Sequence, residues 1–216
     1  MTLAPTRPSE TQITQPPEDL SSLEPFAGRK RWTRSDCDFL ERLGMLPNRY
    51  ELLDGEIIDK MGQNRPHAIA VTLIIKWLIA VFGGDFVQCQ LPIEIADTDR
   101  PNYQPEPDAS VTAQPASAYP EEPPSPGDLR LVVEVADTTL RDDLTTKSGL
   151  YARAGIPEYW AIDINSRRLF VHRGPQNGSY TEVRALLETQ KIATESAPDR
   201  EVLVADLLPP ATVTTE

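Results

Sequence analysis

The sequence predicts a mixed α/β domain in which strands and helices alternate along the chain. Residues 131–135 read LVVEV, an almost wholly apolar, β-branched run typical of a central strand covered on both faces. Residues 67–82 are apolar on most helical faces and end at Gly83-Gly84, which indicates a core helix. Between two short runs at 50–60, the pair Asp54-Gly55 is typical of a two-residue hairpin turn.

The elements follow in a definite order. We expect a helix at 35–43, a hairpin at 50–60, a helix at 67–82, strands at 86–90, 91–96, 108–112 and 131–135, a helix at 141–154, strands at 159–164 and 167–173, and late strands near 181–185 and 201–204. Gly155 and Pro157 are expected to end the helix at 141–154. The proline-rich segment 114–128 is expected to lack regular structure.

The domain organisation follows from composition. The length of 216 residues suits one domain with a tail. Residues 1–28 contain five prolines and little periodic hydrophobicity, so we expect a disordered or loosely packed N-terminal tail. Residues 29–216 then form the folded domain.

The chain is acidic, with 33 Asp and Glu against 21 Lys and Arg and a net charge of −12. This balance argues against a polybasic protein that binds nucleic acid by bulk electrostatics. It leaves room for an enzyme that approaches phosphates through a metal ion. The basic run Arg29, Lys30, Arg31 and Arg34 reads as a solvated segment or, less favoured, as a phosphate contact.

The cysteines and the apolar runs bear on the compartment. Cys37 and Cys89 form no metal-binding pattern, so free thiols in a reducing compartment are preferred over a disulfide. The N-terminus lacks a basic region followed by an apolar one. The longest apolar stretch, 68–82, is shorter than the roughly 20 residues of a membrane span and contains Lys76. We therefore expect a cytoplasmic protein without a membrane segment.

Glu134 is the conspicuous charge, because an ionised carboxylate inside an apolar strand is costly unless it is paired or bound to a metal. Asp108 could lie on the neighbouring strand, and Lys147 on the following helix could approach both. Simpler readings remain: Glu134 could pair with Arg130 or Arg153, Asp108 could begin a strand, and Lys147 could form a surface pair with Asp143.

Two carboxylates and a lysine can form a phosphate-cleaving site. The carboxylates would hold Mg²⁺ or Mn²⁺ with waters, and the metal would activate water and neutralise charge on the phosphate. The lysine would orient or deprotonate the attacking water and stabilise the transition state.

The sequence resembles the Uma2-type (DUF820) family of the PD-(D/E)XK restriction-endonuclease-like superfamily over about residues 48–210. The resemblance rests on YELLDGEI at 50–57, the His67 that opens a helix, PEPDASV at 105–111, and LVVEVADTTLRDDLTTKSGLYARAGIPEYWAID at 131–163. It implies a mixed sheet flanked by helices and a catalytic set of Asp108, Glu134 and Lys147.

The resemblance also implies that Asp108 and Glu134 hold the metal. Position 136 is Ala where the superfamily places its lysine, and Lys147 fits the displaced position of the Uma2 type. Glu51, His67 and Tyr151 are expected as accessory residues. For His67 a helix cap, and for Tyr151 packing that could buttress the lysine, are the simpler readings.

These features predict a Mg²⁺-dependent endonuclease acting on DNA, with DNA binding that depends on metal. A homodimer would supply two sites for two strands. The alternative is an inactive restriction-endonuclease-like module that acts in binding or dimerisation. A glycoside hydrolase is disfavoured, because only 6% of residues are aromatic.

Overall fold

A computed structural model describes residues 30–47, 49–60 and 64–211, and every structural statement below concerns these ranges. The predicted tail at 1–28 lies outside them and stays a prediction. The structure from Arg31 onward contains the sheet, the helices and the site.

A six-stranded sheet in the order β3-β4-β5-β6-β7-β8 forms the centre of this region. Its strands are β3 (Val87–Cys89), β4 (Ala109–Thr112), β5 (Leu129–Ala136), β6 (Glu158–Asp163), β7 (Arg168–Gln176) and β8 (Ser179–Leu187). Only β5 and β6 pair in parallel, and the other neighbours are antiparallel. The sheet is therefore mixed, as predicted.

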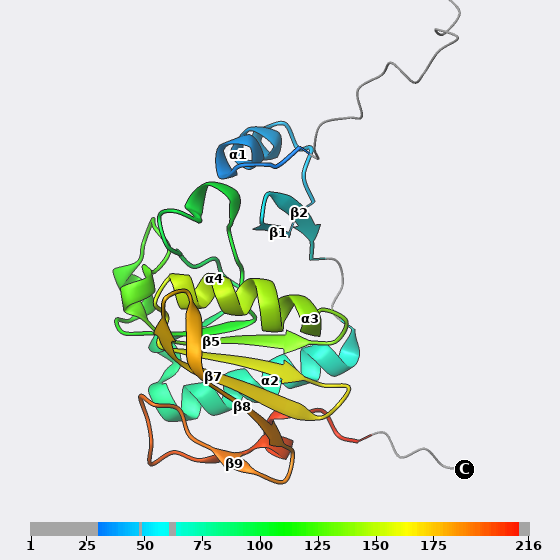
Figure 1. The fold of residues 1–216 in the computed structure, drawn as a ribbon, viewed down its shortest axis with the longest axis vertical. Helices are drawn as coiled ribbons and strands as arrows, with labels where there is room; N and C mark the ends of the chain where they lie inside the picture. Colours follow the sequence, from blue (N-terminus) through cyan, green and yellow to red (C-terminus); the bar gives the residue numbers. More distant parts are fainter. Residues whose placement is uncertain (1–29, 48, 61–63, 212–216) are drawn as a thin grey trace, which may run out of the picture. The chain divides into compact units, whose positions relative to one another are not determined.

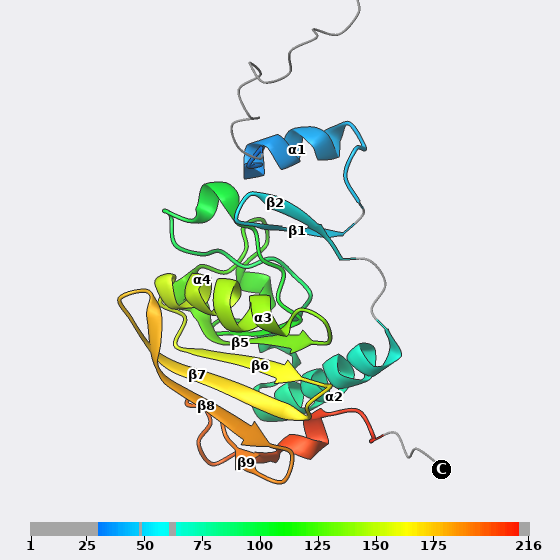
Figure 2. The same cartoon turned by 45° about the vertical axis from the view of Figure 1, so that its right-hand side comes forward.

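The two faces of the sheet are covered by different helices, as both ribbon views show (Figures 1 and 2). Along β5, Leu131, Val133 and Val135 join the apolar cluster of α2 (Arg65–Phe82). Val132 points to the other face, where it packs with Leu150 of α4 (Ser148–Arg153). Glu134 shares the face of Val132, because side chains alternate along a strand.

The long helix α2 has an N-cap and a C-cap residue of the types that commonly end helices. Asn64 accepts a hydrogen bond from the backbone N–H of His67 at 3.0 Å, and Gly83 ends the helix at a φ of 89°. By its length and composition alone, α2 is long and apolar enough to cross a membrane, and helices in protein cores often have the same properties. Its Trp77 stacks on Trp160 of the sheet with ring centroids 5.6 Å apart. The predicted lack of a membrane segment stays a prediction.

The hairpin of β1 (Tyr50–Leu53) and β2 (Glu56–Asp59) forms as predicted. Asp54 and Gly55 have φ values of 51° and 74°, as the two positions of a type I′ turn require. A Cβ at Gly55 would approach the Cβ of Arg31 to 2.8 Å, so glycine is also required by the close approach of the chain.

Helix α1 (Arg34–Arg42) begins one residue before the predicted 35–43. Thr33 and Asp36 form a capping box at its start. Arg34 donates to both oxygens of Glu94, at 2.8 and 3.1 Å, and Arg31 pairs with Asp54. Arg31 is exposed, as a solvated segment predicts, whereas Arg34 is largely buried against Glu94.

The expected strand at 91–96 is wrong. Pro92 has no N–H to donate, and the N–H groups of Ile93 and Glu94 bond to Pro105 and Pro124 in two different loops. Ile93 and Ile95 are nevertheless buried. The segment therefore has the alternating burial of a strand, although it does not pair with another strand of the described ranges.

The expected helix at 141–154 is interrupted. It consists of α3 (Leu140–Asp142), a π-helical segment η6 (Asp143–Lys147) and α4. The proline-rich segment contains only the short 3₁₀ turns η4 (Ala116–Ala118) and η5 (Pro126–Asp128).

Near the C-terminus a separate two-stranded sheet pairs β9 (Lys191–Ile192) with β10 (Val202–Leu203). The late strand expected near 201–204 is thus shorter, and its partner β9 was not anticipated. Cys37 and Cys89 are free thiols, as preferred.

Candidate active site

A cavity of about 300 Å³ opens where the hairpin approaches the ends of β4 and β5. Five of the six residues predicted for the site line it: Glu51, His67, Asp108, Glu134 and Lys147. They come from β1, α2, the residue before β4, β5 and η6, so residues almost a hundred positions apart meet in one place.

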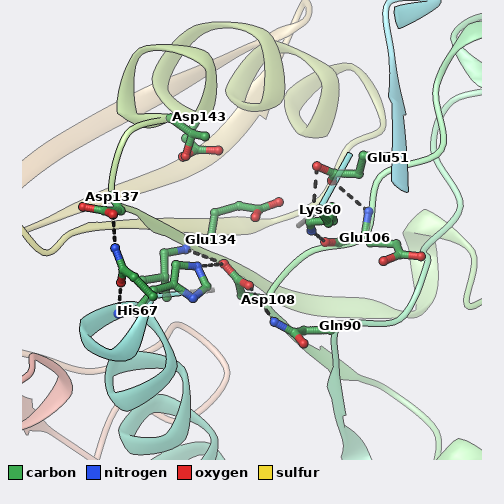
Figure 3. Close-up of polar contacts among 12 residues, drawn as sticks. Glu51, Lys60, His67, Gln90, Glu106, Asp108, Glu134, Asp137 and Asp143 are labelled. Atoms are coloured by element: carbon green, nitrogen blue, oxygen red, sulfur yellow. Dashed lines mark hydrogen bonds and ion pairs between the residues drawn. The ribbon is translucent and has the colours of Figure 1, made fainter. Parts of the chain in front are cut away.

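Asp108 is buried and held by three donors (Figure 3). It lies one residue beyond the pair Ala109–Val133 of the β4–β5 ladder, at the level of Glu134. Its carboxylate accepts from the backbone N–H of Val135 at 2.9 Å and from the Gln90 amide at 3.2 Å. Nε2 of His67 lies 3.3 Å from Oδ2. Burial alone would raise the pKa of Asp108, but His67, Lys60 and the Val135 N–H together lower it.

Glu134 lies on the face of β5 that is covered by α4. Its Oε1 lies 2.9 Å from Nζ of Lys147 and accepts a hydrogen bond of 2.7 Å from the Tyr151 hydroxyl. The alternative pairing with Arg130 or Arg153 is wrong, since Arg130 donates to the carbonyl of Ala113 and Arg153 pairs with Asp99.

Lys147 is buried among three carboxylates. Its Nζ lies 2.9 Å from Glu134, 3.0 Å from Glu51 and 3.8 Å from Asp143. The pair with Asp143 was expected, but at the surface, whereas the lysine is 5% exposed. Tyr151 is fully buried in the apolar cluster on this face of the sheet, as the packing interpretation predicted, and its hydroxyl contacts the carboxylate of Glu134 instead of the lysine.

The π-helical turn carries both Asp143 and Lys147. A wider turn of this kind is frequent at functional sites. Asp143 is buried, and Thr139 donates to its Oδ2 at 2.8 Å, which fixes the carboxylate near the lysine. The hydroxyl of Tyr159 on β6 donates to the backbone carbonyl of Asp143 at 3.1 Å and ties η6 to the sheet.

Glu51 connects the hairpin to the rest of the site. Its Oε1 contacts Lys147 and accepts the backbone N–H of Glu106 at 2.9 Å, while its Oε2 lies 3.7 Å from Nζ of Lys60. Lys60 also donates to the carbonyl of Glu106 at 2.5 Å (Figure 3).

The electrostatics of the site are dominated by acids. Burial raises the pKa of Glu134 to about 8; Glu51 and Asp143 add to this, and Lys147 and Lys60 oppose it. Burial alone would lower the pKa of Lys147, but Glu134, Glu51 and Asp143 raise it, so its ammonium stays charged.

Among the polar residues that line the cavity, Lys60 was not predicted, and Asp143 was considered only as a surface partner of Lys147. Gln90, which donates to Asp108, was expected only as the last residue of a strand. For Lys60 a signal existed. The Asp54-Gly55 turn sets a register in which Glu51 faces Ile58 and Arg49 faces Lys60, so Glu51 and Lys60 share one face of the hairpin. Gln90 lies in a loop with a φ of 51°, which no pattern indicated.

The donor set can be tested against a divalent metal. Within the described ranges no group of three or more His, Cys, Asp or Glu side chains stands ready to hold an ion. Mg²⁺, however, is usually bound by one or two carboxylates and keeps several waters. Asp108 and Glu134 offer two buried carboxylates in one cavity, and the surplus of acids around Glu134 favours an added cation. The residues fit such an ion, with water completing its shell.

Comparisons with known proteins place the family and the fold of this chain. A family model named Uma2, described as "Putative restriction endonuclease", matches residues 38–205. A crystal structure at 1.96 Å of a protein from Anabaena variabilis ATCC 29413, described as a putative nuclease belonging to DUF820, is 19% identical. The match covers 78% of this chain and 96% of that one, with a TM-score of 0.58, and shows a shared fold. No curated protein matches.

Proposed function

This chain belongs to the Uma2 family of restriction-endonuclease-like proteins, and from that premise we propose that it is a Mg²⁺-dependent endonuclease that hydrolyses phosphodiester bonds of DNA. The observation that carries the proposal is the cavity in which Asp108, Glu134 and Lys147 meet. Burying two carboxylates and an ammonium in a cavity lowers the stability of the fold compared with apolar residues at the same positions. Such a cluster therefore indicates a functional site.

Asp108 and Glu134 would hold the metal, with Mn²⁺ as a substitute for Mg²⁺. When bound, such an ion lowers the pKa of its water and neutralises charge on a phosphate. Asp108 contributes a carboxylate that three donors keep ionised and oriented. Glu134 contributes a second carboxylate. Because burial has raised its pKa, an added positive charge would stabilise its ionised form.

Lys147 supplies a fixed positive charge. Because its pKa is raised by three carboxylates, it acts as an electrostatic stabiliser of the developing negative charge on the phosphate. The other role considered for it, deprotonation of the attacking water, is disfavoured by the same shift.

The test is cleavage of supercoiled plasmid DNA with Mg²⁺ or Mn²⁺. We expect Asp108→Asn, Glu134→Gln and Lys147→Met each to lower the nicking rate about 100-fold or more. Glu182→Gln, on the exposed part of β8, is the matched control and should nick like the wild type. A wild type that does not nick, or site variants that nick as fast as it does, would contradict the proposal.

A non-catalytic module is the second candidate. Ala136 stands where the superfamily has its lysine, and the described residues contain no ready group of three metal ligands. Calorimetry with Mn²⁺ separates the two: binding that is lost in Glu134→Gln supports an intact site, and no binding supports the module.

The proposal includes a partner and an assembly. DNA should bind better with metal than without it, because residues 97–143 contain eleven acids against three arginines. A homodimer would place two sites on two strands, and the cytoplasm remains the expected location.

A further inference from the structure

Two lysines share the carboxylate of Glu51, but their surroundings differ. Nζ of Lys147 lies within 4 Å of three carboxylates, at 2.9, 3.0 and 3.8 Å, and 7% of its side chain is exposed. Lys60 makes one hydrogen bond, to the carbonyl of Glu106, and its distance of 3.7 Å from Glu51 is an ion pair without a hydrogen bond. Among the described residues, Lys60 thus keeps donors that no protein atom accepts.

Lys60 is also the more accessible of the two lysines. Its side chain is 17% exposed and it lines the cavity from the end of β2, whereas Lys147 lies deeper on η6. The positive charge of Lys60 lowers the pKa of both Asp108 and Glu134. A charged group that lines the cavity together with these acids, with donors to spare, is placed to meet an anion that enters the cavity.

We infer that Lys60 is a second active-site lysine whose ammonium binds a phosphate oxygen of the nucleic-acid substrate. The inference rests on the proposed nuclease function. A phosphate must approach a site lined by Asp59, Asp137 and the buried acids, so its binding is favoured by a cation whose N–H donors these acids do not all accept. A lysine is a compact point charge suited to a single phosphate oxygen. Lys147, engaged by three carboxylates, would have to give up one of them to do the same.

A purely structural role is the competing explanation, because Lys60 also ties the hairpin to the segment before β4 through Glu106. The two roles differ in salt dependence. Each phosphate contact that is lost reduces the slope of log affinity against log salt by about 0.9 on duplex DNA. A structural tether changes thermal stability and leaves that slope unchanged.

The experiment measures fluorescence anisotropy of a labelled DNA duplex over a range of salt concentrations, with Ca²⁺ in place of Mg²⁺ and a gel to confirm intact DNA. We expect Lys60→Met to bind about 10-fold more weakly and with a slope lower by about 0.9. Lys60→Arg should restore both quantities. Lys191→Met, at the exposed first residue of β9, is the matched control and should behave like the wild type.

The outcomes separate this inference from the proposed function. If the wild type nicks plasmid and Lys60→Met binds with an unchanged slope, Lys60 is structural and the inference is wrong, while the nuclease function stands. If the wild type neither nicks nor binds DNA, the proposed function is wrong and the inference falls with it.

Discussion

Asp108 and Glu134 line one cavity on neighbouring strands, yet their surroundings are opposite in effect. Asp108 receives hydrogen bonds from a backbone N–H and from Gln90 and contacts His67, and its pKa is lowered despite burial. Glu134 has the closer cation, Lys147 at 2.9 Å, and its pKa is nevertheless raised to about 8.

Burial is the largest cause acting on the pKa of both carboxylates, and the difference lies in what accompanies it. At Asp108 the surrounding donors and cations outweigh burial, whereas at Glu134 the neighbouring acids add to it. Lys147 is shared by Glu134, Glu51 and Asp143, so no one of them receives its full charge. Asp108 has its donors to itself. One carboxylate is therefore anchored as an anion in advance, while the charge of the other depends on a further cation.

Removal of the shared cation should have the largest effect. We expect Lys147→Met to lower the free energy of unfolding by about 3–5 kcal/mol at pH 9, where Glu134 is ionised, because it leaves buried carboxylates uncompensated. Thermal and urea unfolding measure this change. The exposed Lys76→Met on α2 is the control and should lie within about 0.5 kcal/mol of the wild type. An equally small loss for Lys147→Met would show that the acids around it are already neutral.

The pH dependence of stability should separate the two carboxylates in sign. The folded pKa of Glu134 is raised, so the protonated form is favoured by folding, and this contribution is lost as pH rises from about 4.5 to about 8. The folded pKa of Asp108 is lowered, so its contribution is present above about 3.8 and is lost as pH falls through the lowered value.

Unfolding in EDTA across this range tests both signs. Glu134→Gln should flatten the fall in stability between pH 5 and 8, by on the order of 1–3 kcal/mol. Asp108→Asn should be less stable than the wild type at pH 7 and approach it in acid. A Glu134→Gln variant that keeps the wild-type slope would contradict the raised pKa.

The individual hydrogen bonds should have the smallest effects. Tyr151→Phe removes the bond to Glu134 and should cost about 1.5–2 kcal/mol, because the bond is short, fully buried and made to a carboxylate. His67→Leu should cost less, about 0.5–1 kcal/mol, because the contact with Asp108 is 3.3 Å and two other donors remain. Urea unfolding of the two variants and the wild type measures both losses of unfolding free energy. A larger loss for His67→Leu than for Tyr151→Phe would contradict this prediction.

Much of this arrangement follows from local sequence. The apolar run at β5 predicted a buried strand with Glu134 on the face of Val132, and the structure confirms both. The Asp54-Gly55 turn, the end of α2 at Gly83 and the approximate bounds of α1 also follow from residues whose backbone preferences are local. Such features depend on neighbours in the chain, which the sequence displays directly.

The tertiary structure decided the rest, because it determines which distant groups become partners. The segment 91–96 has the alternation of a strand, yet its N–H groups find acceptors in two loops instead of a ladder. The π-helical turn that carries Asp143 and Lys147 is held to the sheet by the hydrogen bond from Tyr159, a residue that follows it in the chain on another element. Above all, the sequence by itself indicated two carboxylates and a lysine; only the fold, by bringing Glu51 between Lys147 and Lys60, determined how their charges are shared.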